Sequence, residues 1–205
     1  MRRTFILLTL IVGVGWPVLP GRAESFAADV PAGTWQIDPA RSEIRFTVRK
    51  LGFEDVTGVF RESEGEIRYD QAQPGASAIR WRVRIASVLT DASNRDRTLQ
   101  GQEYFDADRH PYLSFTSGAV RARGDGALDV SGEITIRGVT RPLTIVVRPR
   151  SATTGPSFET DFEIDRYDFG VVGGSFFGRL ISRQVRVHIV VATVPLRPSP
   201  SIRMP

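Results

Sequence analysis

Apolar and polar residues alternate one by one along much of the chain after residue 34, and the stretch 79–85 shows this most clearly. Its sequence, IRWRVRI, places an arginine at every second position. Because successive side chains of a β-strand point to opposite faces, this period of two predicts a strand with one apolar and one solvated face. The same alternation predicts further strands at 44–49, 128–136, 158–165 and 185–191.

Shorter candidate strands bring the predicted total to eight to ten; they lie at 55–61, 64–70, 112–118 and 142–149. Turn signals rich in glycine and proline separate the strands at short intervals, and no helical pattern alternates with them. This arrangement predicts an all-β fold with an antiparallel sheet.

The single apolar face of each strand must be covered, so the sheet must pack on another sheet or close on itself. Closure removes the open edges that promote aggregation, and about eight strands enclose an interior that holds either side chains or one ligand. We therefore expect an eight-stranded antiparallel barrel. Periodicity leaves open whether its interior is filled or hollow.

The stretch 87–111 interrupts the strand pattern. It holds the polar segment NRDR at 94–97, followed by Leu99, Tyr104 and Phe105. We interpret it as a short helix and loop that cap one end of the barrel. With no internal repeat and no second pattern, the sequence predicts one domain over residues 34–194.

Both ends of the chain differ from this domain. Arg2 and Arg3 precede an apolar stretch at 5–18, and small residues around position 23 offer cleavage sites. This is typical of a secretory signal peptide, here predicted as residues 1–23, and the stretch is short for a membrane anchor, which is the alternative. The tail 195–205 has four prolines in eleven residues and is expected to be disordered.

Export changes the charge balance. Cleavage after Ala23 would remove three arginines and no acidic residue, so the net charge would fall from +4 to 4 − 3 = +1. The remaining arginines are spread along strands, which disfavours nucleic-acid binding. The chain has no cysteine. This excludes disulfides and thiolate chemistry and fits a soluble domain in the periplasm.

Motifs for catalysis are missing. The two histidines, His110 and His188, lie on separate predicted elements, and no HExxH pattern, G-x-S-x-G elbow or phosphate-binding loop occurs. We therefore expect no enzymatic activity, no metal site and no cofactor.

Several short segments carry a more specific signal. They are SEIRFTV at 42–48, LG at 51–52 with VTGVF at 56–60, RD at 95–96 with Leu99, YFD at 104–106, HPYLSFTS at 110–117, GEITIRGVTRP at 132–142 and DRYDFG at 165–170. In this order and spacing the chain resembles the YceI-like family of bacterial periplasmic, lipocalin-like proteins. One departure is Lys50, which stands where the family commonly has a histidine.

The resemblance implies a lipocalin-like barrel whose interior binds a polyisoprenoid lipid, such as an isoprenoid quinone or a prenyl phosphate. It implies a periplasmic carrier in transient contact with membranes, and it permits a homodimer because family members often pair. The alternative is a non-enzymatic β-barrel scaffold that acts through a protein partner in the envelope stress response.

A lipid carrier of this kind needs an apolar channel and polar groups at its mouth. Phe105 and Phe169 are expected at the channel ends, with Arg95 and Arg166 as candidates for binding the head group. The alternatives are that the apolar residues simply fill a core and that the arginines pair with neighbouring acids or cap the backbone. The inward-facing side chains expected to line the tail channel are Phe46, Val48, Phe60, Trp81, Val83, Phe115, Phe162 and Val187.

Overall fold

The computed structural model describes residues 30–174 and 177–196. The predicted signal peptide and residues 197–205 of the predicted tail lie outside these ranges. The described chain is mostly β-structure with one α-helix, α1 (Ser93–Gln100). Its strands are β1 (Gly33–Ile37), β2 (Glu43–Lys50), β3 (Glu54–Phe60), β4 (Ser63–Tyr69), β5 (Ala78–Arg84), β6 (Val88–Leu89), β7 (Tyr112–Ala122), β8 (Leu128–Ile136), β9 (Val139–Arg150), β10 (Ser157–Asp165) and β11 (Ile181–Pro195).

Short 3-10 helices join several of these strands. Three of them lie in the early part of the chain, between β1 and β2, between β4 and β5 and between β5 and β6, and two lie in the long connection from β10 to β11. They are η1 (Pro39–Arg41), η2 (Pro74–Ala76), η3 (Ile85–Ser87), η4 (Arg166–Phe169) and η5 (Phe177–Leu180).

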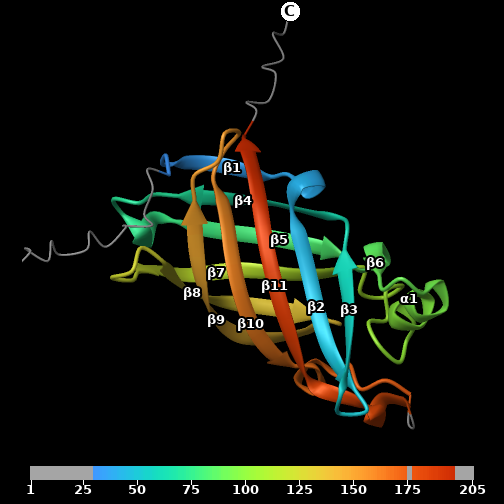
Figure 1. The fold of residues 1–205 in the computed structure, drawn as a ribbon. Helices are drawn as coiled ribbons and strands as arrows, with labels where there is room; N and C mark the ends of the chain where they lie inside the picture. The colour runs from blue at the N-terminus through green and yellow to red at the C-terminus, as the bar shows by residue number, and fades with distance from the viewer. Residues whose placement is uncertain (1–29, 175–176, 197–205) are drawn as a thin grey trace, which may run out of the picture.

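The sheet closes into a ring of eight strands. Their order is β1-β4-β5-β7-β8-β9-β10-β11, and β1 also pairs with β11. Every pairing is antiparallel, so the expectation of an all-β, eight-stranded antiparallel barrel is confirmed. In Figure 1, β11 runs up the front of the barrel between β10 and β2.

One edge of strand β11 pairs with β10, and its other edge is divided between β1 and β2. Its last residues, Thr193–Pro195, pair with β1, whereas the segment from Ile181 to Val190 pairs with β2. Beyond β2, the sheet continues through β3 to β6. Strands β1 and β2 are consecutive in the chain and pair along the same edge of β11, so they form two halves of one bent strand. The same holds for β3 and β4, which pair with β2 and β1. It also holds for β5 and β6, which pair with β4 and β3.

The predicted cap is present with one difference. Helix α1 lies beside β6, at the right of Figure 1. Val88 and Leu89, which we expected in the helix-and-loop region, instead form β6 and pair with Phe60 and Val59 of β3. Two residues are too few to show a period of two, so the pattern could not reveal this strand.

In the part of the chain that the structure describes, no helix is long and apolar enough to cross a bilayer.

The inward faces of the strands form the hydrophobic core. Side chains at the centre of the core are almost completely removed from water, which supplies the main stabilisation of the fold. They include Ile67, Val83, Val88, Phe115, Val120, Val130, Val147 and Phe158.

Candidate ligand-binding cavity

The barrel interior is not completely filled. An apolar cavity of about 150 Å³ lies within it. The wall is formed by Ile44, Arg45, Phe46, Val48, Phe60, Trp81, Val83, Leu99, Tyr104, Phe105, Leu113, Ser114, Phe115, Ile134, Ile136, Phe162, Ile164, Arg166, Phe169, Val171, Ile181, Val185, Val187 and Ile189.

All eight residues expected to line a tail channel lie on this wall, as do Phe105 and Phe169. The placement follows from the strand period, because each lies on the inward face of its strand or on a segment covering the barrel end. Aromatic rings pack against one another at the wall. Phe60 lies 5.5 Å from the Phe46 ring and 6.0 Å from the Phe105 ring, centroid to centroid. Their placement makes them available to a ligand, and a ligand-binding role stays a prediction.

One glycine makes room for the central aromatic ring. Gly132 of β8 lies on the inward face beside Phe115 of β7. A Cβ atom at position 132 would lie only 2.8 Å from Cζ of Phe115. The absence of a side chain at Gly132 therefore leaves room for the Phe115 ring and for the close approach of the β7 backbone at Thr116 and Ser117.

The cap contributes more of the wall than the sequence indicated. Leu99 of α1 and Tyr104 of the following loop reach the cavity together with Phe105. Tyr104 packs with Ile136, Phe169 and Val171 in a second, smaller apolar cluster. We refer to residues 93–106 as the lid. Tyr104 was noticed in the sequence only as part of a motif, because an irregular loop has no period from which burial can be inferred.

The lid is held at its start by a polar cluster that includes Arg95. The Asp96 carboxylate accepts hydrogen bonds from the Thr90 backbone N–H at 2.9 Å and from the Thr90 hydroxyl at 2.6 Å. The Arg95 guanidinium donates to the Thr90 hydroxyl at 2.7 Å and to the Thr90 carbonyl. Arg95 does not line the cavity, so the structure supports the local capping role for this residue over contact with a head group.

Arg166 does lie at the cavity wall, but its donors are already occupied. Its side chain is almost fully buried, with 5% exposed. An arginine has five N–H donors. In Arg166 these make five hydrogen bonds to backbone carbonyls, namely those of Ser182 (2.9 Å), Val171 (2.6 Å), Val172 (2.9 Å), Gly178 (2.6 Å) and Ile181 (3.0 Å). The residue thus fastens the connection between β10 and β11 and has no donor left for a head group.

Asp165 supports the same connection. Its carboxylate accepts a hydrogen bond from the Tyr167 backbone N–H at 2.9 Å and pairs with Arg183 at 2.6 Å. Burial by itself would raise the pKa of the Asp165 carboxyl. The hydrogen bonds from Tyr167 and Arg183 outweigh that effect, and the pKa lies below the ordinary value.

Arg137 joins the lid to this connection, which sequence reasoning missed. It forms the two-residue turn between β8 and β9 with Gly138, and both have positive φ, 52° and 73°. A turn with this backbone matches the twist of a hairpin. The Arg137 guanidinium donates to the carbonyl of Gln102 at 2.7 Å and to that of Gly170. Only the folded chain brings residues 102, 137 and 170 together.

The histidines lie outside the cavity, as far as the described lining shows. His188 of β11 faces Asp161 of β10 on the outer surface, with 2.8 Å between Nδ1 and Oδ1. Glu159 completes a group whose potential ligand atoms all lie within 4.8 Å of one another. Glu159 is also paired with Arg150 at 2.7 Å, so a cation would compete with that guanidinium. The register of β10 against β11 creates this group, and the sequence did not predict it.

A second, smaller apolar cavity of about 60 Å³ lies further along the barrel. Between the two cavities lies a layer of side chains that line both. These are Trp81, Phe115, Ile134, Phe162 and Ile189. The second cavity is lined in addition by Ile37, Ile67, Ile79, Leu143, Ile145, Val147, Phe158, Thr160 and Val191.

A closed antiparallel barrel with an apolar interior cavity and a lid defines a lipocalin-like class of protein. Residues 35–193 match the sequence model of the YceI-like domain, and the chain belongs to that family. Among its relatives, a UPF0312 protein of Pseudomonas fluorescens is 31% identical over 73% of this chain and 82% of its own length. A UPF0312 protein of Pseudomonas putida is 26% identical over 92% of this chain and 97% of its own.

Solved structures share the fold at lower identity. BcnA of Burkholderia cenocepacia superimposes with a TM-score of 0.71 and 20% identity, covering 76% of this chain and 98% of BcnA. A polyisoprenoid binding domain from Saccharophagus degradans, implicated in plant cell wall breakdown, superimposes with a TM-score of 0.62 and 17% identity. It covers 81% of this chain and all of that domain (100%).

Proposed function

We propose that this protein binds a long-chain polyisoprenoid lipid inside the barrel and carries it through the periplasm. The observation that supports this most is the apolar cavity inside the barrel, whose wall combines aromatic and aliphatic side chains from the strands and the lid. The structural neighbour from Saccharophagus degradans, described as a polyisoprenoid binding domain, adds support from the same fold.

The energetics favour an apolar tail as the main source of affinity. Burying apolar surface contributes roughly 0.8 kcal/mol per methylene, so each five-carbon isoprene unit contributes about 3–4 kcal/mol. Association and ordering cost about 4–15 kcal/mol, which several buried units exceed. One head-group hydrogen bond adds only about 0.5–1.5 kcal/mol, or about 1.5–3 kcal/mol if charged. The tail would therefore set affinity and the head group selectivity.

We infer binding rather than catalysis from the composition of the wall. Among the lining residues that the structure describes, the polar or charged ones are Arg45, Tyr104, Ser114 and Arg166. A hydrolase needs a nucleophile with a base within hydrogen-bond reach. The hydrogen bonds of Arg166 go to backbone carbonyls, which fits a structural role.

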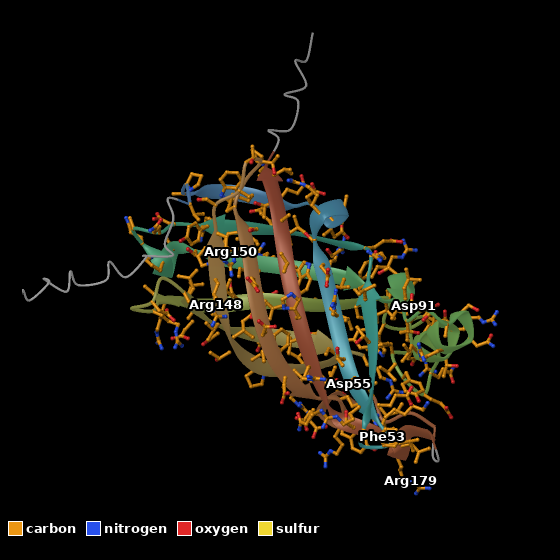
Figure 2. All side chains as sticks on the ribbon, viewed as in Figure 1. Phe53, Asp55, Asp91, Arg148, Arg150 and Arg179 are labelled. Carbon is orange, nitrogen blue, oxygen red and sulfur yellow. The ribbon has the colours of Figure 1, made fainter. Side chains whose placement is uncertain are left out.

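The hairpin between β2 and β3 offers a surface for loading from a bilayer. Phe53 is 79% exposed and Leu51 is 49% exposed. Figure 2 shows Phe53 at the tip of this hairpin, at the same end of the barrel as Arg179. Large apolar side chains this exposed are unfavourable in water and insert readily into a membrane interface. We propose that this tip contacts the membrane transiently during lipid transfer. Phe53→Ser should reduce transfer to phospholipid vesicles while lipid occupancy stays unchanged.

Native mass spectrometry of the exported protein, with organic extraction, tests the main proposal. We expect a stoichiometric polyisoprenoid that is released chemically intact, and uptake of added octaprenyl alcohol by the emptied barrel. A folded barrel that contains no lipid and takes up none would contradict the proposal and favour a scaffold that binds a protein partner. Conversion of the extracted lipid on incubation would favour an enzyme.

Phe115→Ala provides the residue-level test, because Phe115 is buried and lies between the two cavities. Removing its ring should lower lipid occupancy, since the tail would lose a large contact area. Far-UV circular dichroism and a melting curve show whether the variant is folded. Thr116→Ala, at the neighbouring exposed position of β7, is the matched control.

A further inference from the structure

One layer of apolar side chains divides the interior of the barrel. Its members line both the first and the second cavity, so they separate the two spaces. We refer to this layer as the partition. It consists of Trp81 of β5, Phe115 of β7, Ile134 of β8, Phe162 of β10 and Ile189 of β11.

The strand register places the members of the partition at one level. Trp81 is directly paired with Phe115, and Phe115 with Ile134, so three neighbouring strands contribute side by side. On β10 and β11, Ile189 is paired with the residue two places before Phe162. Two such residues are diagonal neighbours on the same face of a sheet and lie within reach of each other. The backbone ladders therefore hold all five positions.

The partition is firmly packed at its centre. Phe115 and Ile189 are each only 5% exposed. The Phe115 ring lies against the backbone of β8 at Gly132, where a Cβ atom would come within 2.8 Å of it. A backbone held in a ladder does not yield as the end of a flexible side chain would. A hydrocarbon that reaches the partition thus meets a wall.

The lid covers only one of the two cavities. Leu99, Tyr104 and Phe105 of the lid line the first cavity, and no lid residue lines the second. The second cavity is also smaller, at about 60 Å³ against about 150 Å³. A tail that enters from the lid end must therefore occupy the first cavity and reach the partition before any carbon atom could enter the second.

We infer that the partition sets the length of the hydrocarbon tail that this protein holds. This rests on the proposed function and names the residues that discriminate between shorter and longer tails. Each isoprene unit that enters the first cavity buries apolar surface and adds to affinity. A unit that would have to pass the partition finds no space and stays outside. Affinity should therefore rise with tail length and then reach a plateau.

Prenyl alcohols of two to eight isoprene units show where this plateau lies. They are delivered from cyclodextrin to the emptied protein and compete with a fluorescent prenyl lipid. For wild type, we expect each added unit to tighten binding by at least about tenfold before the plateau and by less than about twofold beyond it.

Two substitutions should move the plateau in opposite directions. Phe162→Ala opens the partition and joins the two cavities, so the plateau should shift to longer alcohols. Phe162 is only half-buried, and its removal should disturb the fold less than removal of Phe115. Val187→Phe adds a ring to the first cavity beside Phe162, its partner on β10, and should shift the plateau to shorter alcohols.

Val120→Ala is the matched control, because Val120 is a buried residue of β7 that lines neither cavity. It should lower the melting temperature without moving the plateau. If Phe162→Ala does not fold, Phe162→Leu takes its place. No plateau up to eight units, the same plateau in every variant, or an equal shift in Val120→Ala would overturn the role of the partition and leave lipid binding intact. Failure of wild type to bind any of the alcohols would overturn the proposed function as well.

Discussion

Phe46 of β2 and Gly58 of β3 are directly paired across the sheet, and the Phe46 ring lies over the position where a Gly58 side chain would be. A Cβ atom on residue 58 would lie 2.6 Å from Cε1 of Phe46 and 2.8 Å from Cγ2 of Thr90. The ring of a cavity-lining residue is thus placed by the absence of a side chain on the neighbouring strand.

Gly58→Ala should therefore displace the Phe46 ring into the cavity. We expect a loss of about 1–3 kcal/mol in the free energy of unfolding, typical of overpacking, together with lower lipid occupancy. Urea unfolding and lipid extraction measure the two effects. Adding Phe46→Leu should restore part of both. Gly118→Ala is the control, because its nearest contact would be 3.8 Å away; an equal loss there would refute the explanation.

Arg137→Asn should loosen the lid without weakening the barrel. Asparagine tolerates the positive φ of this turn, but it cannot reach the carbonyls of Gln102 and Gly170. We expect a change in unfolding free energy below about 1 kcal/mol, with lipid exchange about fivefold faster. Stopped-flow transfer of a fluorescent prenyl lipid to vesicles measures the rate. Arg141→Asn, an exposed change on β9, should leave it unaltered. An unchanged rate in Arg137→Asn would show that the hydrogen bonds from Arg137 to the lid and to Gly170 do not limit lipid exchange.

Arg166→Met should destabilise the fold without altering which head groups bind. The substitution removes five hydrogen bonds to largely buried carbonyls, and we expect a loss of about 3 kcal/mol or more. Arg166→Lys should be intermediate, because an ammonium group has three donors and lacks the planar geometry. Chemical denaturation gives the stabilities, and competition between octaprenyl alcohol and octaprenyl phosphate gives the selectivity. If Arg166→Lys were as stable as wild type but no longer distinguished the alcohol from the phosphate, Arg166 would instead be assigned to binding the head group.

Asp165→Asn should reduce stability at neutral pH more than in acid. The folded-state pKa of Asp165 is lowered: burial opposes the shift, but the hydrogen bonds from Tyr167 and Arg183 outweigh it. A lowered pKa contributes stability that is complete above the unfolded-state value and is lost as the pH falls through the folded-state value. The difference between wild type and variant should therefore be full at pH 7 and disappear only below the ordinary aspartate value of 3.8. Denaturation curves over this range measure it, and a difference independent of pH would contradict the assignment.

Much of the fold could be predicted because strand period and burial are local properties. Once 79–85 or 185–191 is a strand, its alternation decides which side chains point inward, and Trp81, Val83 and Val187 do line the cavity. The lid could be located because 87–111 breaks the pattern. Even so, the two-residue strand β6 and the inward position of Tyr104 were missed, because neither lies in a segment long or regular enough to have a period.

The sequence by itself determined the strands, their inward faces and the likeness to one family, since these depend on neighbours along the chain. Only the tertiary structure decided which polar groups are free. In the folded chain, every N–H donor of Arg166 is bonded to a backbone carbonyl of residues 171–182, and Arg95 is bonded to Thr90. The Thr160 hydroxyl has no hydrogen-bond partner. The tertiary structure also left the interior hollow. Hydrogen-bond partners and unfilled volume depend on distances between residues far apart in the sequence, and no local pattern encodes those distances.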